Sequence, residues 1–186
     1  SLEVDLSNYT DDNSELKGNS EELNQIRWFI DLYSKVDIPV LILGETGTGK
    51  ELVAKEIHKK SNRRSKELVI INCGAIPETL IESELFGAKA EGASGVTKDR
   101  KGAFERAHNS TLFLDEFGDM SPLVQVKVLR AIENGEILPV GGTKTIKVDV
   151  RVICATSLKL KEKAGKEFRI DLFYRVGGLF PEIPPL

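Results

Sequence analysis

The feature that most constrains this chain is a glycine-rich loop between an apolar run, residues 39–43, and a helical stretch, residues 51–60. Glycines let the backbone curl so that successive N–H groups point inward, and the start of the following helix adds a positive dipole end. The lysine that ends the loop suits the β- and γ-phosphates of a nucleotide. The sequence therefore predicts a phosphate-binding loop of the pattern G-x-x-x-x-G-K, made of Gly44, Glu45, Thr46, Gly47, Thr48, Gly49 and Lys50.

The residue after Lys50 departs from the usual form of this motif. A Ser or Thr commonly follows the lysine, and its hydroxyl reaches Mg²⁺. Here the position is Glu51. Either Mg²⁺ loses a direct protein ligand, or water and a distant carboxylate take that place.

Apolar, β-rich runs alternate with helical patterns along the chain, which predicts an α/β fold with a mainly parallel sheet covered on both faces. A hairpin is expected over residues 136–150, around Gly141-Gly142. Buried strands are expected over residues 39–43, 68–72, 111–114 and 150–156, and helices from Asn19, over 51–60, over 77–85 and over 121–134.

Two of the helices have an apolar stripe at helical spacing. Asn19 is the expected N-cap of the first helix, with Glu22 as its capping-box partner. In the helix that begins at Ser121-Pro122, Asn134-Gly135 predicts the end. The stripes consist of Leu23, Ile26, Ile30 and Tyr33 in the first helix, and of Leu123, Val126, Leu129 and Ile132 in the second.

Composition indicates one ordinary globular domain. The chain has 186 residues, of which 40% are apolar and 30% charged. No run approaches the ~20 apolar residues that a membrane-spanning helix needs. The acidic N-terminus lacks a signal-peptide core, so we expect a cytoplasmic protein that does not act in a membrane. Residues 1–18 are polar and are expected to form a linker ahead of a domain over 19–186.

The cysteine, histidine and charge patterns exclude other classes of site. Cys73 and Cys154 end apolar runs and are expected to be buried free thiols. No metal-ligand spacing occurs, so no structural zinc is expected. The net charge is −3, and the basic segment 59–66 is expected to be a solvated helix end. We therefore expect DNA to be read through a domain that is not in this chain.

A second motif lies 65 residues beyond Lys50, where the apolar run 111–114 ends in Asp115 and Glu116. Alternation along a strand would aim the two carboxylates differently. Asp115 can then hold the shell of a Mg²⁺ ion, partly through water, while Glu116 orients and polarises an attacking water. With the phosphate-binding loop, this pair predicts nucleotide hydrolysis.

Several blocks together resemble the central AAA+ domain of bacterial sigma-54-dependent transcription activators of the NtrC type. The resemblance runs from about residue 16 to the end of the chain, in order and with near-constant spacing. In that family a Glu also follows the loop lysine, which agrees with Glu51. The matching blocks are Gly44–Glu51, Asn72-Cys73-Gly74-Ala75, Glu82-Ser83-Glu84-Leu85-Phe86-Gly87, Thr111–Glu116, Val140-Gly141-Gly142-Thr143 and Phe168–Arg175.

This resemblance implies an AAA+ P-loop NTPase fold, a three-layer sandwich with a mainly parallel five-stranded sheet, a loop insertion and a β-hairpin. It also implies ATP and Mg²⁺ as cofactors and a ring of six or seven subunits. Asn72 would hold Glu116 away from water until the partner and nucleotide are in place. Arg169 and Arg175 would reach the γ-phosphate of a neighbouring subunit, whereas taken alone they suggest only surface salt bridges.

The chain departs from the family at the loop whose tip contacts sigma-54. The family motif Gly-Ala-Phe-Thr-Gly-Ala corresponds here to the partner loop Glu91, Gly92, Ala93, Ser94, Gly95 and Val96. Aligned without a gap, Ala93 replaces the Phe; aligned with a gap, the Phe is missing and the flanks remain. Both alignments remove the aromatic anchor, a residue type that often dominates an interface.

Two further departures concern the nucleotide. The family usually has Ala-Thr-Asn where this chain has Ala155-Thr156-Ser157, so the contact to the γ-phosphate would pass through the shorter Ser157. The family also continues into a helical lid beyond the point where this chain ends, and we expect the chain to be a fragment.

The resulting hypothesis is an ATPase that remodels the sigma-54 RNA polymerase holoenzyme. Two alternatives remain open at this point. One is an AAA+ ATPase of the same lineage that acts on a different protein through the altered loop. The other is a module that uses ATP only to set its oligomeric state.

Overall fold

A parallel four-stranded sheet forms the centre of the protein in the computed structural model, which describes residues 15–18, 20–45, 47–90, 92, 95, 97–157 and 164–177. The strands lie in the order β1-β6-β3-β2, and every neighbouring pair is parallel. The bounds are Val40–Leu43 for β1, Val69–Asn72 for β2, Ser110–Asp115 for β3 and Val150–Thr156 for β6. The expected parallel sheet is confirmed, but the expectation of a buried strand over 68–72 is wrong, because β2 is an edge strand in which only Ile71 is buried. The fifth strand that the resemblance implied is not among the described residues, and residues 178–186 lie outside them.

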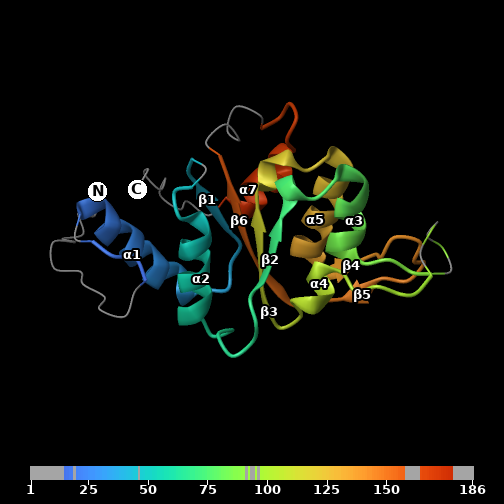
Figure 1. Ribbon diagram of the computed structural model, residues 1–186, viewed down its shortest axis with the longest axis horizontal. Helices are drawn as coiled ribbons and strands as arrows, with labels where there is room; N and C mark the ends of the chain where they lie inside the picture. The colour runs from blue at the N-terminus through green and yellow to red at the C-terminus, as the bar shows by residue number, and fades with distance from the viewer. Residues whose placement is uncertain are drawn as a thin grey trace.

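Helices cover both faces of this sheet and complete the expected three-layer sandwich (Figure 1). Side chains alternate between the faces of a strand, so Val40 and Ile42 pack against α1 and α2, while Leu41 and Leu43 pack against the other layer. The helices are α1 (Glu21–Ser34) and α2 (Lys50–Lys60) on one face, and α3 (Glu78–Phe86), α4 (Ala103–Arg106), α5 (Pro122–Asn134) and α7 (Ile170–Val176) on the other.

The start of α1 differs from the sequence prediction. The helix begins at Glu21, and its N-cap is Ser20 instead of the expected Asn19, because Ser20 Oγ accepts a hydrogen bond from Leu23 N at 3.3 Å. A hydroxyl and an amide oxygen are both good N-cap acceptors, so the sequence alone does not choose between adjacent positions. The expected stripe is confirmed at Ile26, Ile30 and Tyr33, which are buried, whereas Leu23 is half-buried.

The buried face of α5 is also not the one that the apolar stripe predicted. Of that stripe only Leu129 is buried, and Leu123 is 60% exposed. The helix instead buries Val124, Gln125 and Val128 beside Leu129. Gln125 decides this orientation, because its amide bonds the backbone of two neighbouring segments. A pattern of apolar residues does not reveal a polar residue in the core.

A hairpin and a loop insertion project from the side of the sheet that bears α3 and α4 (Figure 1). The hairpin strands β4 (Glu136–Ile137) and β5 (Ile146–Lys147) are antiparallel, as expected. The insertion follows α3, where Ala88 pairs with Arg100 in antiparallel fashion and with Val140 of the hairpin in parallel fashion. The insertion and the hairpin are therefore joined through their backbones.

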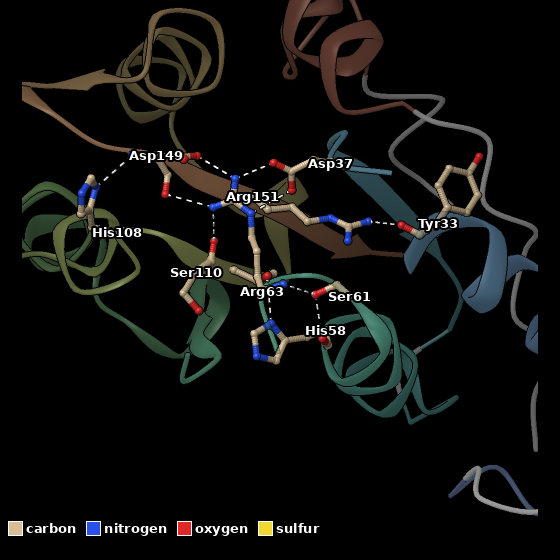
Figure 2. A network of polar contacts seen from close by, with 10 residues as sticks. Tyr33, Asp37, His58, Ser61, Arg63, His108, Ser110, Asp149 and Arg151 are labelled. Atoms are coloured by element: carbon tan, nitrogen blue, oxygen red, sulfur yellow. Dashed lines mark hydrogen bonds and ion pairs between the residues drawn. The ribbon is translucent and has the colours of Figure 1, made fainter. Parts of the chain in front are cut away.

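One arginine ties together the amino-terminal ends of three strands (Figure 2). Arg63, just after α2, holds the Asp37 carboxylate through Nε and Nη2, and its Nη1 donates to the carbonyls of Ser110 and Asp149. Its side chain is 11% exposed. The expectation that the basic segment 59–66 is a solvated helix end is therefore wrong for Arg63, because the carboxylates and carbonyls that bind it come from distant parts of the chain.

The side chains of His58 and of the two cysteines are buried in the interior of the domain. His58 Nδ1 lies 2.9 Å from Thr111 Oγ1 and Nε2 lies 2.8 Å from Lys66 O, and burial lowers the pKa of His58. Cys73 and Cys154 are buried free thiols, as predicted. Burial raises the pKa of the Cys73 thiol to about 12. Among the described residues, no helix is both long and apolar enough to cross a membrane.

Candidate nucleotide-binding and hydrolysis site

The predicted site residues follow strands that end at the same edge of the sheet. The register pairs Leu43 with Thr156 and Asn72 with Asp115. The loops after these carboxyl ends therefore lie close together, which is where ligands bind in open parallel sheets. The glycine-rich loop, residues 44–49, follows β1, Glu116 follows β3, and Ser157 follows β6.

The glycine loop adopts the curled backbone that the motif requires. Gly47 and Gly49 have φ values of +84° and +83°, a conformation that side chains disfavour. Gly44 N donates to Thr156 O at 3.2 Å, and Thr48 Oγ1 donates to Glu45 O at 2.8 Å. Gly49 is the N-cap of α2 and provides no side-chain cap, which leaves the first amides of the helix available to an anion. Thr46 lies outside the described residues.

Lys50 is held inside this loop. Its side chain is buried, and Nζ donates to the carbonyls of Gly44 at 3.0 Å and Glu45 at 2.7 Å. The ammonium is thus positioned by neutral oxygens, which phosphate oxygens can replace. Glu51 points along the surface of α2 and forms an ion pair with Lys55 at 2.6 Å.

Asp115 and Glu116 lie at the end of β3, and their side chains point in different directions. The cause is not the strand alternation that the sequence suggested. Asp115 is the last strand residue, and its Oδ1 accepts from Glu116 N at 2.9 Å. Glu116 is past the strand, with φ 51° and ψ 40°. This left-handed conformation, not strand alternation, turns its side chain. Such strain costs about 1–3 kcal/mol and clusters at functional sites.

The surroundings of Glu116 raise the pKa of its carboxyl group above the usual value. Burial raises the pKa of Glu116, the charge of Asp115 raises it further, and Asp119 adds to the rise, while Lys50 opposes it. A carboxyl group with a raised pKa is a typical feature of catalytic sites. Asp119 was not singled out by the sequence, because it belongs to no motif and reaches the site through the short helix η2 (Phe117–Asp119).

Asn72 is the last residue of β2 and the N-cap of the short helix η1 (Cys73–Ala75). Its Oδ1 accepts from Gly74 N at 3.0 Å and Ala75 N at 3.2 Å. A Cβ atom on Gly74 would lie 3.2 Å from Glu116 Cβ and 3.5 Å from Asn72 Oδ1. Gly74 therefore lies close to both of these side chains. Because the amide oxygen is engaged, the Asn72 group that can meet a carboxylate is Nδ2.

Thr156 joins the glycine loop to the turn that contains Glu116. Its carbonyl accepts from Gly44 N, and its Oγ1 accepts from Gly118 N at 3.3 Å. The sequence analysis assigned phosphate sensing to the next residue, Ser157, which is half-buried at the end of β6. The role of Thr156 was missed because both of its partners are distant in sequence.

Arg169 and Arg175 lie on α7, away from these contacts. Arg169 is the N-cap residue, and its side chain pairs with Asp171 at 2.7 Å. This neighbouring carboxylate raises the pKa of Arg169. Arg175 is exposed and lines a surface hollow with Asp37 and Val150, at the amino-terminal edge of the sheet. Neither arginine forms a hydrogen bond or ion pair with the described residues of the glycine loop.

The predicted partner loop is described only at Gly92 and Gly95; Glu91, Ala93, Ser94 and Val96 lie outside the described residues. Gly92 packs against the hairpin tip so closely that a Cβ atom on it would lie 2.0 Å from Gly141 O.

Comparison with known proteins agrees with this geometry. The Sigma-54 interaction domain family matches residues 16–180. The Nif-specific regulatory protein of Azospirillum brasilense is 52% identical over 148 residues, which are 79% of this chain and 24% of that protein. The hydrogenase transcriptional regulatory protein HoxA of Cupriavidus necator is 50% identical over 155 residues, 82% of this chain and 32% of that protein.

A solved structure shares the fold closely. NtrX from Brucella abortus in complex with ATP superposes with a TM-score of 0.84 at 38% identity, covering 92% of this chain and 37% of NtrX. The chain therefore spans about a third or less of the length of the Nif-specific regulatory protein and of HoxA. With its glycine loop, its Asp115-Glu116 pair and its hairpin and insertion in place, the chain belongs to the sigma-54 interaction domain family of AAA+ proteins.

Proposed function

We propose that this domain hydrolyses ATP and uses the energy to remodel the sigma-54 RNA polymerase holoenzyme in the cytoplasm. The observation that supports hydrolysis best is the placement of Lys50 and Glu116. A buried ammonium lies in the curled glycine loop after β1, and a carboxyl group of raised pKa follows β3 at the same edge of the sheet. Binding of ATP requires only the buried ammonium, whereas hydrolysis requires the carboxyl group as well.

In this proposal Lys50 exchanges the carbonyls of Gly44 and Glu45 for phosphate oxygens of ATP. The loop amides and the start of α2 complete the phosphate cradle. Asp115 holds the magnesium shell, partly through water, and Mg²⁺ when bound neutralises charge on the phosphates. Glu116 orients and polarises the attacking water, and Asn72 Nδ2 keeps the carboxylate away from it in the resting state.

The two arginines of α7 act on a neighbouring subunit in a ring of six or seven copies. Arg169 would leave Asp171, with which it forms an exposed ion pair, to reach the neighbour's γ-phosphate. An exposed pair is screened by solvent and contributes little to stability, so Arg169 can leave Asp171 at little cost. An arginine supplied in trans typically raises turnover by about 10³–10⁵, and an isolated subunit should therefore hydrolyse ATP slowly.

The test is an ATPase assay on the full-length protein, with and without sigma-54 in the presence of a trapped analogue of ATP hydrolysis. Glu116→Gln is the matched control, because it keeps the size and polarity of the side chain. We expect Glu116-dependent turnover together with analogue-dependent capture of sigma-54. Turnover without capture would remove sigma-54 as the partner, and nucleotide-dependent assembly without turnover would remove the ATPase assignment.

A further inference from the structure

A buried amide bonds the start of α7 to the short helix that follows Glu116. Gln125 of α5 is fully buried. Its Nε2 donates to Met120 O at 2.8 Å, and its Oε1 accepts from Arg169 N at 2.8 Å. Met120 is the C-cap of η2, whose N-cap is Glu116, and Arg169 is the N-cap of α7. One side chain therefore joins the turn that begins at Glu116 to the residue that carries an exposed guanidinium.

A second contact, between two aromatic rings, joins the same two segments. Phe117, which follows Glu116, packs against Phe168, which precedes Arg169, with the ring centroids 5.1 Å apart. Both rings are buried, and a protein interior is packed so closely that a displaced ring has no free volume to enter. A shift of η2 therefore displaces the start of α7. The ring contact is independent of the amide bridge, because it depends on packing and not on hydrogen bonds.

The turn at Glu116 is placed to respond to the nucleotide of its own subunit. Its backbone has φ 51°, and Asp115 Oδ1 accepts from Glu116 N at 2.9 Å. In the proposed function the Asp115 carboxylate also holds the magnesium shell, so binding of Mg²⁺ with ATP competes with this hydrogen bond. Thr156 adds a link, since its carbonyl binds Gly44 N in the glycine loop and its Oγ1 binds Gly118 N in η2. A nucleotide that favours one arrangement of the turn shifts the population toward it.

We propose that Gln125 and the Phe117–Phe168 pair transmit the state of a subunit's own nucleotide site to the Arg169 that this subunit presents to its neighbour. All three are positioning residues, because they act through Glu116 and Arg169. The inference rests on the proposed function, in which Arg169 acts in trans. It adds regulation to that function, since the nucleotide bound in one subunit sets the placement of the arginine in the next site.

The test measures the position of α7 in the full-length protein by double electron–electron resonance between two spin labels. The labels are attached at Lys35→Cys, after α1, and at Lys166→Cys, before α7. Both positions are exposed, whereas the native thiols of Cys73 and Cys154 are buried. Any other exposed cysteine of the full-length protein is replaced by serine. Labelled subunits are diluted into an excess of unlabelled subunits, so that each distance lies within one subunit. Distances are recorded with ADP and with the trapped analogue of ATP hydrolysis.

Two variants cut the two contacts separately. Gln125→Met keeps the length of the side chain and removes the amide bridge, and Phe168→Leu removes the ring contact. The control is Gln25→Met, the same exchange at an exposed position of α1. We expect the label distance to differ between the two nucleotides in the unsubstituted protein and in the control. The difference should be lost in Gln125→Met and reduced in Phe168→Leu.

Steady-state kinetics provides a second measurement on the same variants. Gln125→Met should lower kcat by roughly tenfold to a hundredfold, because a small misplacement of a catalytic group slows the reaction strongly. KM for ATP should change little, because the variant keeps its own glycine loop. Gln25→Met should keep both constants.

A nucleotide-dependent shift that persists in Gln125→Met, or that is absent from an unsubstituted protein with normal turnover, would overturn the proposal. A raised KM with an unchanged kcat would also overturn it. Circular dichroism checks folding; if Gln125→Met does not fold, Phe168→Leu decides, and an undiminished shift in that variant overturns the proposal. An unsubstituted protein that shows the shift without turnover contradicts the proposed ATPase function instead.

Discussion

Arg63 and Asp149 are joined twice across 86 positions of sequence, by Nη1 to the backbone carbonyl at 3.2 Å and by Nη2 to the carboxylate at 2.7 Å. The same guanidinium binds Asp37, which precedes β1, and Ser110, which begins β3 (Figure 2). One side chain thus holds the amino-terminal ends of three strands. The nucleotide loops lie at the opposite ends of these strands, so this contact stabilises the sheet without touching the ligand.

Arg63→Ala should lower the free energy of unfolding by about 2 kcal/mol, because it leaves two carbonyls and two carboxylates without their donor. Arg63→Lys should recover less than half of the loss, since an ammonium cannot form the forked contact. Urea denaturation followed by circular dichroism measures both. Arg64→Ala, which removes an exposed neighbour, is the control and should change stability by less than about 0.5 kcal/mol. A loss of similar size in both variants would contradict the assignment.

Replacing Gln125 with an apolar residue of equal size should destabilise the protein. The Gln125 Nε2 donates to Met120 O at 2.8 Å and Glu167 O at 3.2 Å, and its Oε1 accepts from Arg169 N at 2.8 Å. Gln125→Leu keeps the volume but leaves these buried groups unpaired, at a loss of about 3 kcal/mol. The ATPase rate of the assembled protein should fall as well, because the start of α7 loses its anchor.

Thermal denaturation of Gln125→Leu is compared with that of Gln25→Leu, the same exchange at an exposed position of α1. The exposed exchange should leave the midpoint nearly unchanged. If Gln125→Leu is neutral or stabilising, the buried amide does not fix the orientation of α5.

The capping role of the Asn72 oxygen and the proposed contact of its Nδ2 with Glu116 can be separated by substitution. Asn72→Asp keeps the oxygen that caps Gly74 N and Ala75 N but loses Nδ2, whereas Asn72→Ala loses both. We expect Asn72→Ala to lose about 1 kcal/mol of stability, as for other caps, and Asn72→Asp to lose much less. Both should alter the response of ATP turnover to sigma-54, since neither can donate to Glu116. The assays are run near pH 8, where the added carboxylate is ionised. Equal stability losses would contradict the capping role of the oxygen.

Asp119→Asn should shift the pH dependence of turnover. The negative charge of Asp119 raises the pKa of Glu116, and hydrolysis needs the ionised form of that carboxyl group. The wild-type rate therefore rises with pH through the raised pKa, and removal of the charge should move this acid limb to lower pH. A pH profile of kcat measures the shift, with Glu105→Gln, a remote carboxylate in α4, as the control. An unmoved limb would show that Asp119 does not act on Glu116.

The elements that the sequence predicted correctly depend on local patterns. The loop that ends at Lys50 is encoded within seven residues, and the Asp115-Glu116 pair is encoded by one strand end. The alternation of apolar strands with helices is also a local pattern, and it predicted the parallel sheet and its three layers. The N-cap at Ser20 and the buried face of α5 were misassigned because neighbouring positions satisfy the same local rule, and only packing chooses between them.

The amino-acid sequence by itself determined the strand–loop–helix unit around Lys50, the two carboxylates and the class of fold, because glycine conformation, periodicity and motif spacing act over a few residues. Only the tertiary structure decided that Arg63 joins three strands, that Thr156 links the glycine loop to the Glu116 turn, and that the insertion is bonded to the hairpin. These contacts join segments that are 26 or more positions apart. Apart from the carboxylates of Asp37 and Asp149, the partners in these contacts are backbone groups, which every residue has, so side-chain patterns in the sequence do not identify them.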